Sequence, residues 1–267
     1  MTGPLDLADL RTLAEQTARA AGGLLRTAMG RIRAEVSTKT TGTDMVTEMD
    51  RASEALIADR LLGMRPHDGI LGEEGADVTG TSGVRWVVDP LDGTTNYLYG
   101  FPGFNVSIAA EVDGEAAVGV VYDVVRDELF SAVRGGGATR EGQPIRASSA
   151  TDLPHALVGT GFSYEPEQRR RQAEVLVHVL PRVRDIRRQG AAALDLCSVA
   201  CGRLDAYYER GLAVWDLAAG GLIAREAGAQ VTDLDGGPPT AGSVVAAAPG
   251  IAAALRDLLA TTGAAGA

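Results

Sequence analysis

Asp89 and Asp92 are the residues whose type and spacing most clearly indicate chemistry. A short buried strand over 85–88 should deliver Asp89 to its end, and Pro90 should stop the strand because proline has no N–H for the ladder. The turn that follows can bring Asp92 back beside Asp89. Two carboxylates held this close repel each other unless cations lie between them. Mg²⁺, a hard ion that binds carboxylates, waters and phosphate oxygens, is the natural partner.

Gly93, Thr94 and Thr95 follow directly and supply the other half of the pattern. Glycine permits a close approach of the backbone, and the threonines are typical of the first turn of a helix. Free N–H groups at a helix start bind anions such as phosphate. Carboxylates beside such a site would repel a bound phosphate, so this arrangement also requires cations between the two. Asp-Pro and Asp-Gly also occur as ordinary turn residues, so this segment alone leaves both interpretations open.

Three further carboxylates favour the metal interpretation, and each has an ordinary alternative. Glu73 lies in a Gly-Glu-Glu-Gly turn that could reach the same strand end, although paired glutamates are often solvated surface. Asp216 opens an apolar helix, where a first-turn negative charge is favourable in any case. Thr47 and Asp50 have the spacing of a helix capping box.

The composition excludes several classes of function. The chain has 267 residues, enough for one large domain or two intimate ones, and its net charge of −10 argues against nucleic acid as a partner. We find no apolar run of about 18 residues and no signal peptide, so we expect no membrane span. Cys197 and Cys201 are the only cysteines, which favours a reducing compartment and a cytoplasmic location.

Hydrophobic periodicity places helices and strands in both halves of the chain. The expected helices cover 6–29, 47–62, 166–180, 190–201, 215–227 and 251–260, with a loop over 38–43. The expected strands are 85–88, 106–108, 118–120, 129–133, 205–208 and 244–248, with Asp113-Gly114 as a hairpin turn. This mixture indicates a layered α/β or α+β architecture.

Four segments in this order resemble the inositol monophosphatase family, and the resemblance extends from about residue 6 to 260. They are residues 44–50, 72–74, 89–96 and 215–220. The resemblance implies a layered α-β-α-β-α sugar-phosphatase fold, a homodimer, and lithium-sensitive, Mg²⁺-dependent hydrolysis of phosphate monoesters. We expect an N-terminal α+β subdomain over 1–149 with most metal ligands. A C-terminal α/β subdomain over 150–267, in the same compact unit, would carry the substrate contacts and the last ligand.

The resemblance also assigns roles to residues, beginning with two to three Mg²⁺ ions per subunit. Glu73, Asp89 and the backbone carbonyl of Leu91 would hold the first ion. Asp89, Asp92 and Asp216 would hold the second, and a third, weaker ion would lie by Glu73 and waters. This agrees with the chemistry read from the residues, because two divalent ions can activate a water and steady the leaving oxygen.

Phosphate and substrate contacts follow in the same way. Backbone N–H groups of Gly93 and Thr94 would bind the phosphate, and Thr94 with Asp50 would orient and help deprotonate the attacking water. The substrate ring would meet the backbone of Ala192, the carboxylate of Glu209 and, by a looser match, Ser163. Glu209 has an ordinary alternative as a surface charge paired with a neighbouring arginine such as Arg210. Lys39 precedes the metal loop, where the family often has a basic residue.

The expected activity is hydrolysis of inositol-1-phosphate to inositol and inorganic phosphate by a metal-activated water. Glu209 favours a polyol, because a carboxylate suits vicinal hydroxyls and repels a second phosphate. Histidinol-phosphate, fructose-1,6-bisphosphate and nucleotide 3′-phosphate phosphatases are alternatives of the same fold. An alternative of another class is a regulatory binding protein of the transcription machinery. The complete set of carboxylates at Glu73, Asp89, Asp92 and Asp216 favours an enzyme.

Overall fold

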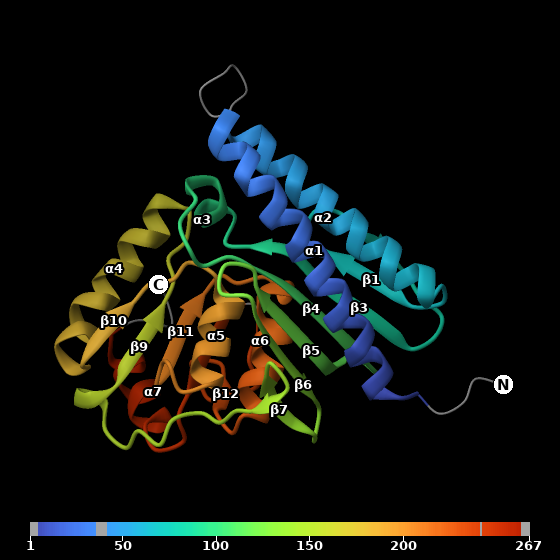
Figure 1. Cartoon of the computed structure of the whole chain (residues 1–267). Helices are drawn as coiled ribbons and strands as arrows, with labels where there is room; N and C mark the ends of the chain where they lie inside the picture. The colour runs from blue at the N-terminus through green and yellow to red at the C-terminus, as the bar shows by residue number, and fades with distance from the viewer. Residues whose placement is uncertain (1–4, 36–41, 241, 263–267) are drawn as a thin grey trace.

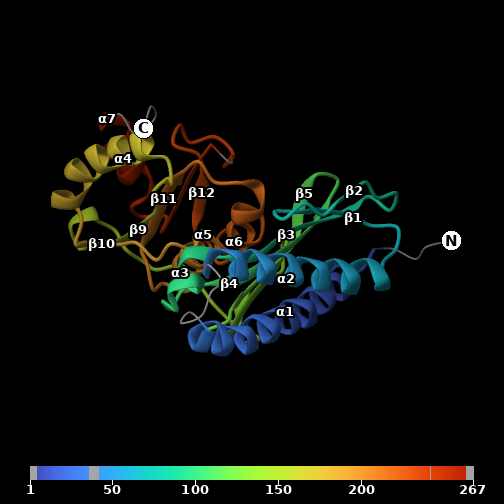
Figure 2. The same cartoon turned by 90° about the horizontal axis from the view of Figure 1, so that it is seen from above.

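A computed structural model describes residues 5–35, 42–240 and 242–262. Helices and two β-sheets alternate in layers in the order α-β-α-β-α, which Figures 1 and 2 show from two directions. The fold class predicted from the sequence is therefore confirmed. Within the described part of the chain, no helix combines the length and apolar character needed to cross a membrane.

The first layer is a pair of long helices, α1 (Leu7–Glu35) and α2 (Gly42–Met64), which lie side by side against the larger sheet (Figure 1). The fully buried residues of α1 recur at helical spacing: Leu10, Ala14, Ala18, Ala21 and Leu25. This apolar stripe packs on the sheet, and the helix predicted over 6–29 is confirmed. The second helix begins at Gly42 rather than near Thr47, so part of the predicted loop is helical; residues 38–41 lie outside the described residues.

The second layer is a sheet with strand order β2-β1-β3-β4-β5-β6-β7-β8. Its strands are β1 (Gly69–Gly72), β2 (Asp77–Val78), β3 (Val84–Asp92), β4 (Asn105–Val112), β5 (Glu115–Asp123), β6 (Glu128–Val133), β7 (Gly137–Arg140) and β8 (Gln143–Pro144). β1 and β3 are parallel, and the other neighbours are antiparallel. The predicted hairpin turn is confirmed between β4 and β5, where Asp113 and Gly114 have φ values of 56° and 80°. Positive φ at both positions gives the turn that matches the twist of the strands.

β3 differs from the prediction in a way that matters for the site. The strand does not stop at Asp89-Pro90 but continues to Asp92. Asp89 pairs with Ser107 and Asp92 with Asn105, so β3 has one more residue than β4 over this stretch and forms a bulge. The expectation was wrong because a bulge tolerates proline, which has no N–H to donate there.

The central helical layer consists of α5 (Ala192–Ala200) and α6 (Val214–Glu226), between the two sheets. α6 lies directly on β5, since a Cβ added to Gly119 would come within 2.7 Å of the carbonyl oxygen of Ala219. This close packing fixes the height of α6 above the larger sheet, and with it the position of the first turn of α6 near the end of β3.

The smaller sheet and its outer helices complete the molecule. Strand order is β10-β9-β11-β13-β12, with β9 (Leu157–Thr160), β10 (Asp185–Arg187), β11 (Ala206–Arg210), β12 (Gln230–Thr232) and β13 (Ser243–Ala247). The remaining helical elements are α3 (Thr94–Tyr99), α4 (Pro166–Val179), α7 (Ala252–Thr261) and the 3-10 turns η1 (Leu153–His155) and η2 (Leu180–Arg182). The predicted strands at 205–208 and 244–248 are present as β11 and β13. Sequence analysis missed β9, β10 and β12, which are too short to show a period.

Candidate active site

Three aspartates from two distant segments meet at one edge of the larger sheet. Asp89 and Asp92 flank the bulge of β3, and Asp216 lies in the first turn of α6. One carboxylate oxygen from each of the three residues lies within 4.8 Å of the other two. Asp89 is 1% exposed and Asp92 is 8% exposed, so water screens their charges poorly.

This confinement changes the acidity of the cluster. Burial, together with repulsion from Asp92, Glu73 and Asp216, raises the pKa of Asp89 well above its usual value. Burial and the neighbouring Asp216 raise the pKa of Asp92 to about 7, and burial raises the pKa of Asp216 to about 6. Burial also raises the pKa of Glu73. The cluster therefore holds protons at neutral pH that a cation would displace.

Hydrogen bonds hold two of the carboxylates in place. Asn105 Nδ2 donates to Asp92 Oδ2 at 2.8 Å, and the backbone N–H of Ala193 donates to the same oxygen at 2.9 Å. The backbone N–H of Ala213 donates to Asp216 Oδ2 at 2.6 Å. Asp216 therefore acts as an ordinary first-turn carboxylate of α6, which was its alternative interpretation. Its side chain also reaches the aspartate cluster.

Glu73 approaches from β1, which runs parallel to β3. Its turn is fastened by Glu54 of α2, whose two carboxylate oxygens each accept a backbone N–H, from Glu74 and Ala76, at 2.8 Å. The backbone N–H of Glu73 donates to the carbonyl of Val88 at 3.2 Å. The predicted turn at the strand end is therefore present. Glu54, which shapes it, was missed by sequence analysis.

After β3 ends at Asp92, the chain turns into α3 through Gly93, whose φ of 89° favours glycine. A Cβ at this position would also lie 2.7 Å from the carbonyl oxygen of Gly103. The Thr94 hydroxyl donates to the Leu91 carbonyl at 3.1 Å, which ties the helix start to the bulge of β3. The first N–H groups of α3 have no carbonyl partner within the helix and can face an anion.

One cavity of about 480 Å³, within the usual size for a small-molecule site, collects these residues. All the predicted site residues except Asp50 line it: Glu73, Asp89, Leu91, Asp92, Gly93, Thr94, Ser163, Ala192, Glu209 and Asp216. Arg188, which sequence analysis did not single out, lines it as well. Segments from both halves of the chain thus close around a single space.

Comparison with known proteins agrees with this geometry. The sequence matches the model of the inositol monophosphatase family over residues 6–264. The chain belongs to this family. It is 49% identical over 277 residues to the Inositol-1-monophosphatase SuhB of Mycobacterium tuberculosis (strain ATCC 25618 / H37Rv), covering 94% of this chain and 93% of that protein. It is 43% identical over 243 residues to the Nus factor SuhB of Pasteurella multocida, covering 90% and 91%. The solved structure of Mycobacterium tuberculosis SuhB has a TM-score of 0.84 and 46% identity, covering 97% of this chain and 98% of that one.

Asp50 is the one predicted site residue that does not line the cavity. It is 4% exposed, and its Oδ1 accepts no hydrogen bond from the residues that the structure describes. The capping-box interpretation is wrong, because α2 begins at Gly42 and Asp50 lies inside the helix. The structure also differs from the expected contact with Thr94, whose hydroxyl donates to Leu91 instead. Burial, and then Glu74, Glu73 and Glu54, raise the pKa of Asp50 to about 8.

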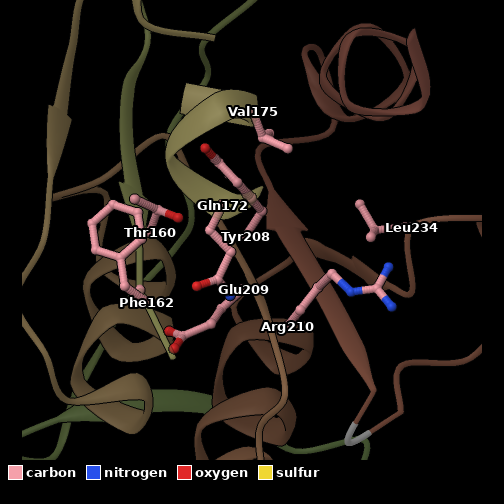
Figure 3. Close-up of a pocket in the computed structure, with 9 residues that line it drawn as sticks. Thr160, Phe162, Gln172, Val175, Tyr208, Glu209, Arg210 and Leu234 are labelled. Carbon is pink, nitrogen blue, oxygen red and sulfur yellow. The ribbon is translucent and has the colours of Figure 1, made fainter. Parts of the chain in front are cut away.

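A further part of the cavity wall is formed by β11 and by the loop after β9. Glu209 accepts a hydrogen bond from the Tyr207 hydroxyl, and burial raises its pKa to about 7. Figure 3 shows Arg210 directed away from the Glu209 carboxylate, toward Leu234, which does not favour a Glu209–Arg210 pair. Arg188, which lines the same cavity, is the arginine whose charge lowers the pKa of Glu209, so pairing of Glu209 with an arginine stays an alternative. Ser163 lines the cavity, and its backbone N–H donates to Gln172 Oε1 at 2.8 Å. Lys39 lies outside the described residues.

The donor set fits a hard divalent cation. The cluster offers only oxygen ligands, which Mg²⁺ and similar ions prefer over softer metals. Its raised pKa values show that the carboxylates are crowded beyond what their own hydrogen bonds compensate. An added ion of charge +2 would remove this repulsion, so the family's metal dependence has a physical basis in these residues.

We expect the metal-free protein to lose stability as the pH rises from about 5 to 8. The folded pKa values of Asp92 and Asp216, about 7 and about 6, exceed the value of about 3.9 expected in the unfolded chain. The folded state therefore binds more protons, and this stabilisation is lost as the pH passes through the folded values. One pKa unit corresponds to about 1.4 kcal/mol, so Asp92 alone should contribute at least about 1 kcal/mol.

Thermal unfolding in chelator across this pH range checks the expectation. Asp92→Asn should flatten the decline, whereas Asp77→Asn, a change at an exposed position on β2, should follow the wild type. A wild-type stability that rises through the same range, or an Asp92→Asn variant with an unchanged slope, would contradict the burial of mutually repelling carboxylates.

Proposed function

We propose that this protein is a Mg²⁺-dependent phosphomonoesterase that hydrolyses inositol-1-phosphate to inositol and inorganic phosphate. The observation that carries the proposal is the single cavity, which combines a carboxylate cluster, the open start of α3 and the carboxylate of Glu209. The names of relatives with nearly half of their residues in common support the same substrate. A hydrolase of this kind needs positioning and charge neutralisation rather than a covalent nucleophile.

Each carboxylate has a role in this proposal. Glu73, Asp89 and the Leu91 carbonyl would hold one Mg²⁺, and Asp89, Asp92 and Asp216 would hold a second. Glu73 with waters would hold a third, weaker ion. When bound, such ions supply the positive charge that activates a water and stabilises the leaving oxygen. Asn105 keeps Asp92 oriented for this task through the hydrogen bond to Oδ2.

The chain's own polar groups would position the phosphate and the water. Backbone N–H groups of Gly93 and Thr94 at the start of α3 would orient phosphate oxygens. Asp50 would receive a proton through the Thr94 hydroxyl once that hydroxyl turns from the Leu91 carbonyl toward Asp50. Burial and the neighbouring glutamates raise the pKa of Asp50 to about 8 in the metal-free chain, so the positive charge of bound ions would be needed to keep Asp50 deprotonated for this role.

Another part of the cavity would bind the ring of the substrate. Glu209 would accept hydrogen bonds from ring hydroxyls, with the Ala192 backbone and Ser163 as further contacts. A negative carboxylate here disfavours sugar bisphosphates and nucleotide bisphosphates, since it repels a second phosphate. Histidinol phosphate, which carries a cationic amine, is the rival that the same charge would tolerate.

Several properties of the whole protein follow from the family assignment as proposals. We propose a homodimer with lithium-sensitive activity, located in the cytoplasm, with the metal ligands concentrated in residues 1–149 and the substrate contacts in 150–267. The two cysteines of the chain, Cys197 and Cys201, are unpaired, as a reducing compartment would require. A second candidate function is regulatory binding to the transcription machinery, which relatives named Nus factor SuhB favour.

The substrate assignment is tested by Glu209→Ala. Loss of charge-assisted hydrogen bonds worth about 1.5–3 kcal/mol should lower kcat/KM for inositol-1-phosphate by roughly 10- to 150-fold. An aryl phosphate has no hydroxyl at that position, so its hydrolysis should barely change. The measurement compares both substrates, with histidinol phosphate and fructose-1,6-bisphosphate, at saturating Mg²⁺. Glu174→Ala, at an exposed site on α4, is the control. Wild-type preference for another phosphate, or equal losses on both substrates, would overturn the assignment.

The role of Asp50 is tested by Asp50→Asn, which keeps the shape of the side chain and removes its basicity. We expect kcat to fall by ~10²–10⁴, the usual weight of acid–base assistance, in a folded protein. Asp59→Asn, on the exposed side of the same helix, should retain full activity. A near-normal kcat in Asp50→Asn would return this residue to a purely structural role.

A further inference from the structure

Gly161 lies in unusually close contact with the carboxylate on which the substrate assignment depends. A Cβ added to Gly161 would overlap with Cδ, Oε1 and Oε2 of Glu209, so the whole carboxylate group rests against the Cα of the glycine. Figure 3 shows the Glu209 side chain directed toward the segment between Thr160 and Phe162. Only a residue without a side chain leaves room for this placement.

The Glu209 carboxylate is confined from a second direction by Tyr207. The two residues point to the same side of β11, because side chains alternate along a strand. The Tyr207 hydroxyl donates to Glu209, and the Tyr207 side chain is fully buried. Any shift of the carboxylate away from Gly161 would therefore disturb this hydrogen bond and move the negative charge within the cavity.

The loop that carries Gly161 is itself fixed, so it cannot easily retreat from an added methyl group. Thr160, the preceding residue, pairs with Tyr208 of β11. Two residues later, Ser163 donates its backbone N–H to the side chain of Gln172, which is 8% exposed on α4. The glycine is thus held between a sheet and a helix, and the flexible end of Glu209 is the part that must move.

We propose that Gly161 is a specificity-determining residue for the polyol part of the substrate. By leaving space over its Cα, it allows Glu209 to present its carboxylate to ring hydroxyls rather than elsewhere in the cavity. This inference rests on the proposed function, since it concerns the group that Glu209 reads. Gly161 acts through Glu209 and is a positioning residue; the three atoms nearest to a Cβ placed on it all belong to the Glu209 carboxylate group.

Gly161→Ala tests the inference. The φ of Gly161 lies outside the left-handed region that favours glycine, so alanine introduces no backbone strain there, and the displaced group is the end of a flexible side chain. We expect a folded protein whose kcat/KM for inositol-1-phosphate falls at least about tenfold, as for loss of one charge-assisted hydrogen bond. Hydrolysis of p-nitrophenyl phosphate should stay within about twofold of the wild type. Gly63→Ala, where a Cβ meets nothing within 4 Å, is the matched control.

A double variant shows whether the effect passes through Glu209. In the Glu209→Ala background, Gly161→Ala should cost nothing further, because the carboxylate that it displaces is already gone. In the Glu209→Asp background, which shortens the side chain by one methylene, Gly161→Ala should cost less than it does in the wild type. Losses that multiply in the double variant would overturn the proposal, as would an unchanged substrate preference in Gly161→Ala.

The wild-type measurement separates this inference from the proposed function. A wild type that prefers inositol-1-phosphate while Gly161→Ala keeps that preference contradicts only the role of Gly161. A wild type without the preference contradicts the proposed substrate and, with it, the polyol role of Gly161. Parallel loss of aryl phosphate hydrolysis would show that the methyl group damages the site as a whole, which also contradicts a role in specificity.

Discussion

Electrostatic repulsion among buried carboxylates is the constraint on which the rest of this structure depends. Asp89, Asp92 and Asp216 each bring one carboxylate oxygen within 4.8 Å of the other two, and Asp89 and Asp92 are buried where water screens their charges poorly. The bulge of β3 places two of them, the start of α6 supplies the third, and Asn105 orients Asp92. Such an arrangement opposes stability unless a cation completes it, so the fold maintains it for binding rather than for packing.

The layered architecture explains how two sheets can serve one cavity. Gly119 lets α6 lie directly on β5, which brings Asp216 to the end of β3. The smaller sheet then delivers Glu209 from β11 to the wall of the same cavity, and Gly161 from the loop after β9 lies against the Glu209 carboxylate. The aspartate cluster and the carboxylate of Glu209 are therefore supplied by different layers.

The sequence was most informative where the signal is local. Long amphipathic helices such as α1, and the Asp113-Gly114 hairpin, follow from periodicity and turn chemistry alone. The carboxylates that the structure brings together were singled out because they occur in dense motifs. The end of β3 was predicted wrongly at Pro90, because no feature of the local sequence indicates the bulge in which a residue without an N–H is tolerated. Glu54, Asn105 and Gly161 were missed because their partners are distant in sequence, although Glu54 lies one helical turn after Asp50 and could have been suspected.

Calorimetric titration of Mg²⁺ into the metal-free protein tests the central claim most directly, because a cation that relieves buried repulsion must displace protons. Binding heats measured in buffers of different ionisation enthalpy give the number of protons released. With pKa values of about 7 for Asp92 and about 6 for Asp216, we predict release on the order of one proton per chain or more near pH 6, and fewer protons above about pH 8. Tight binding at pH 6 without proton release, or no binding at either pH, would contradict the claim.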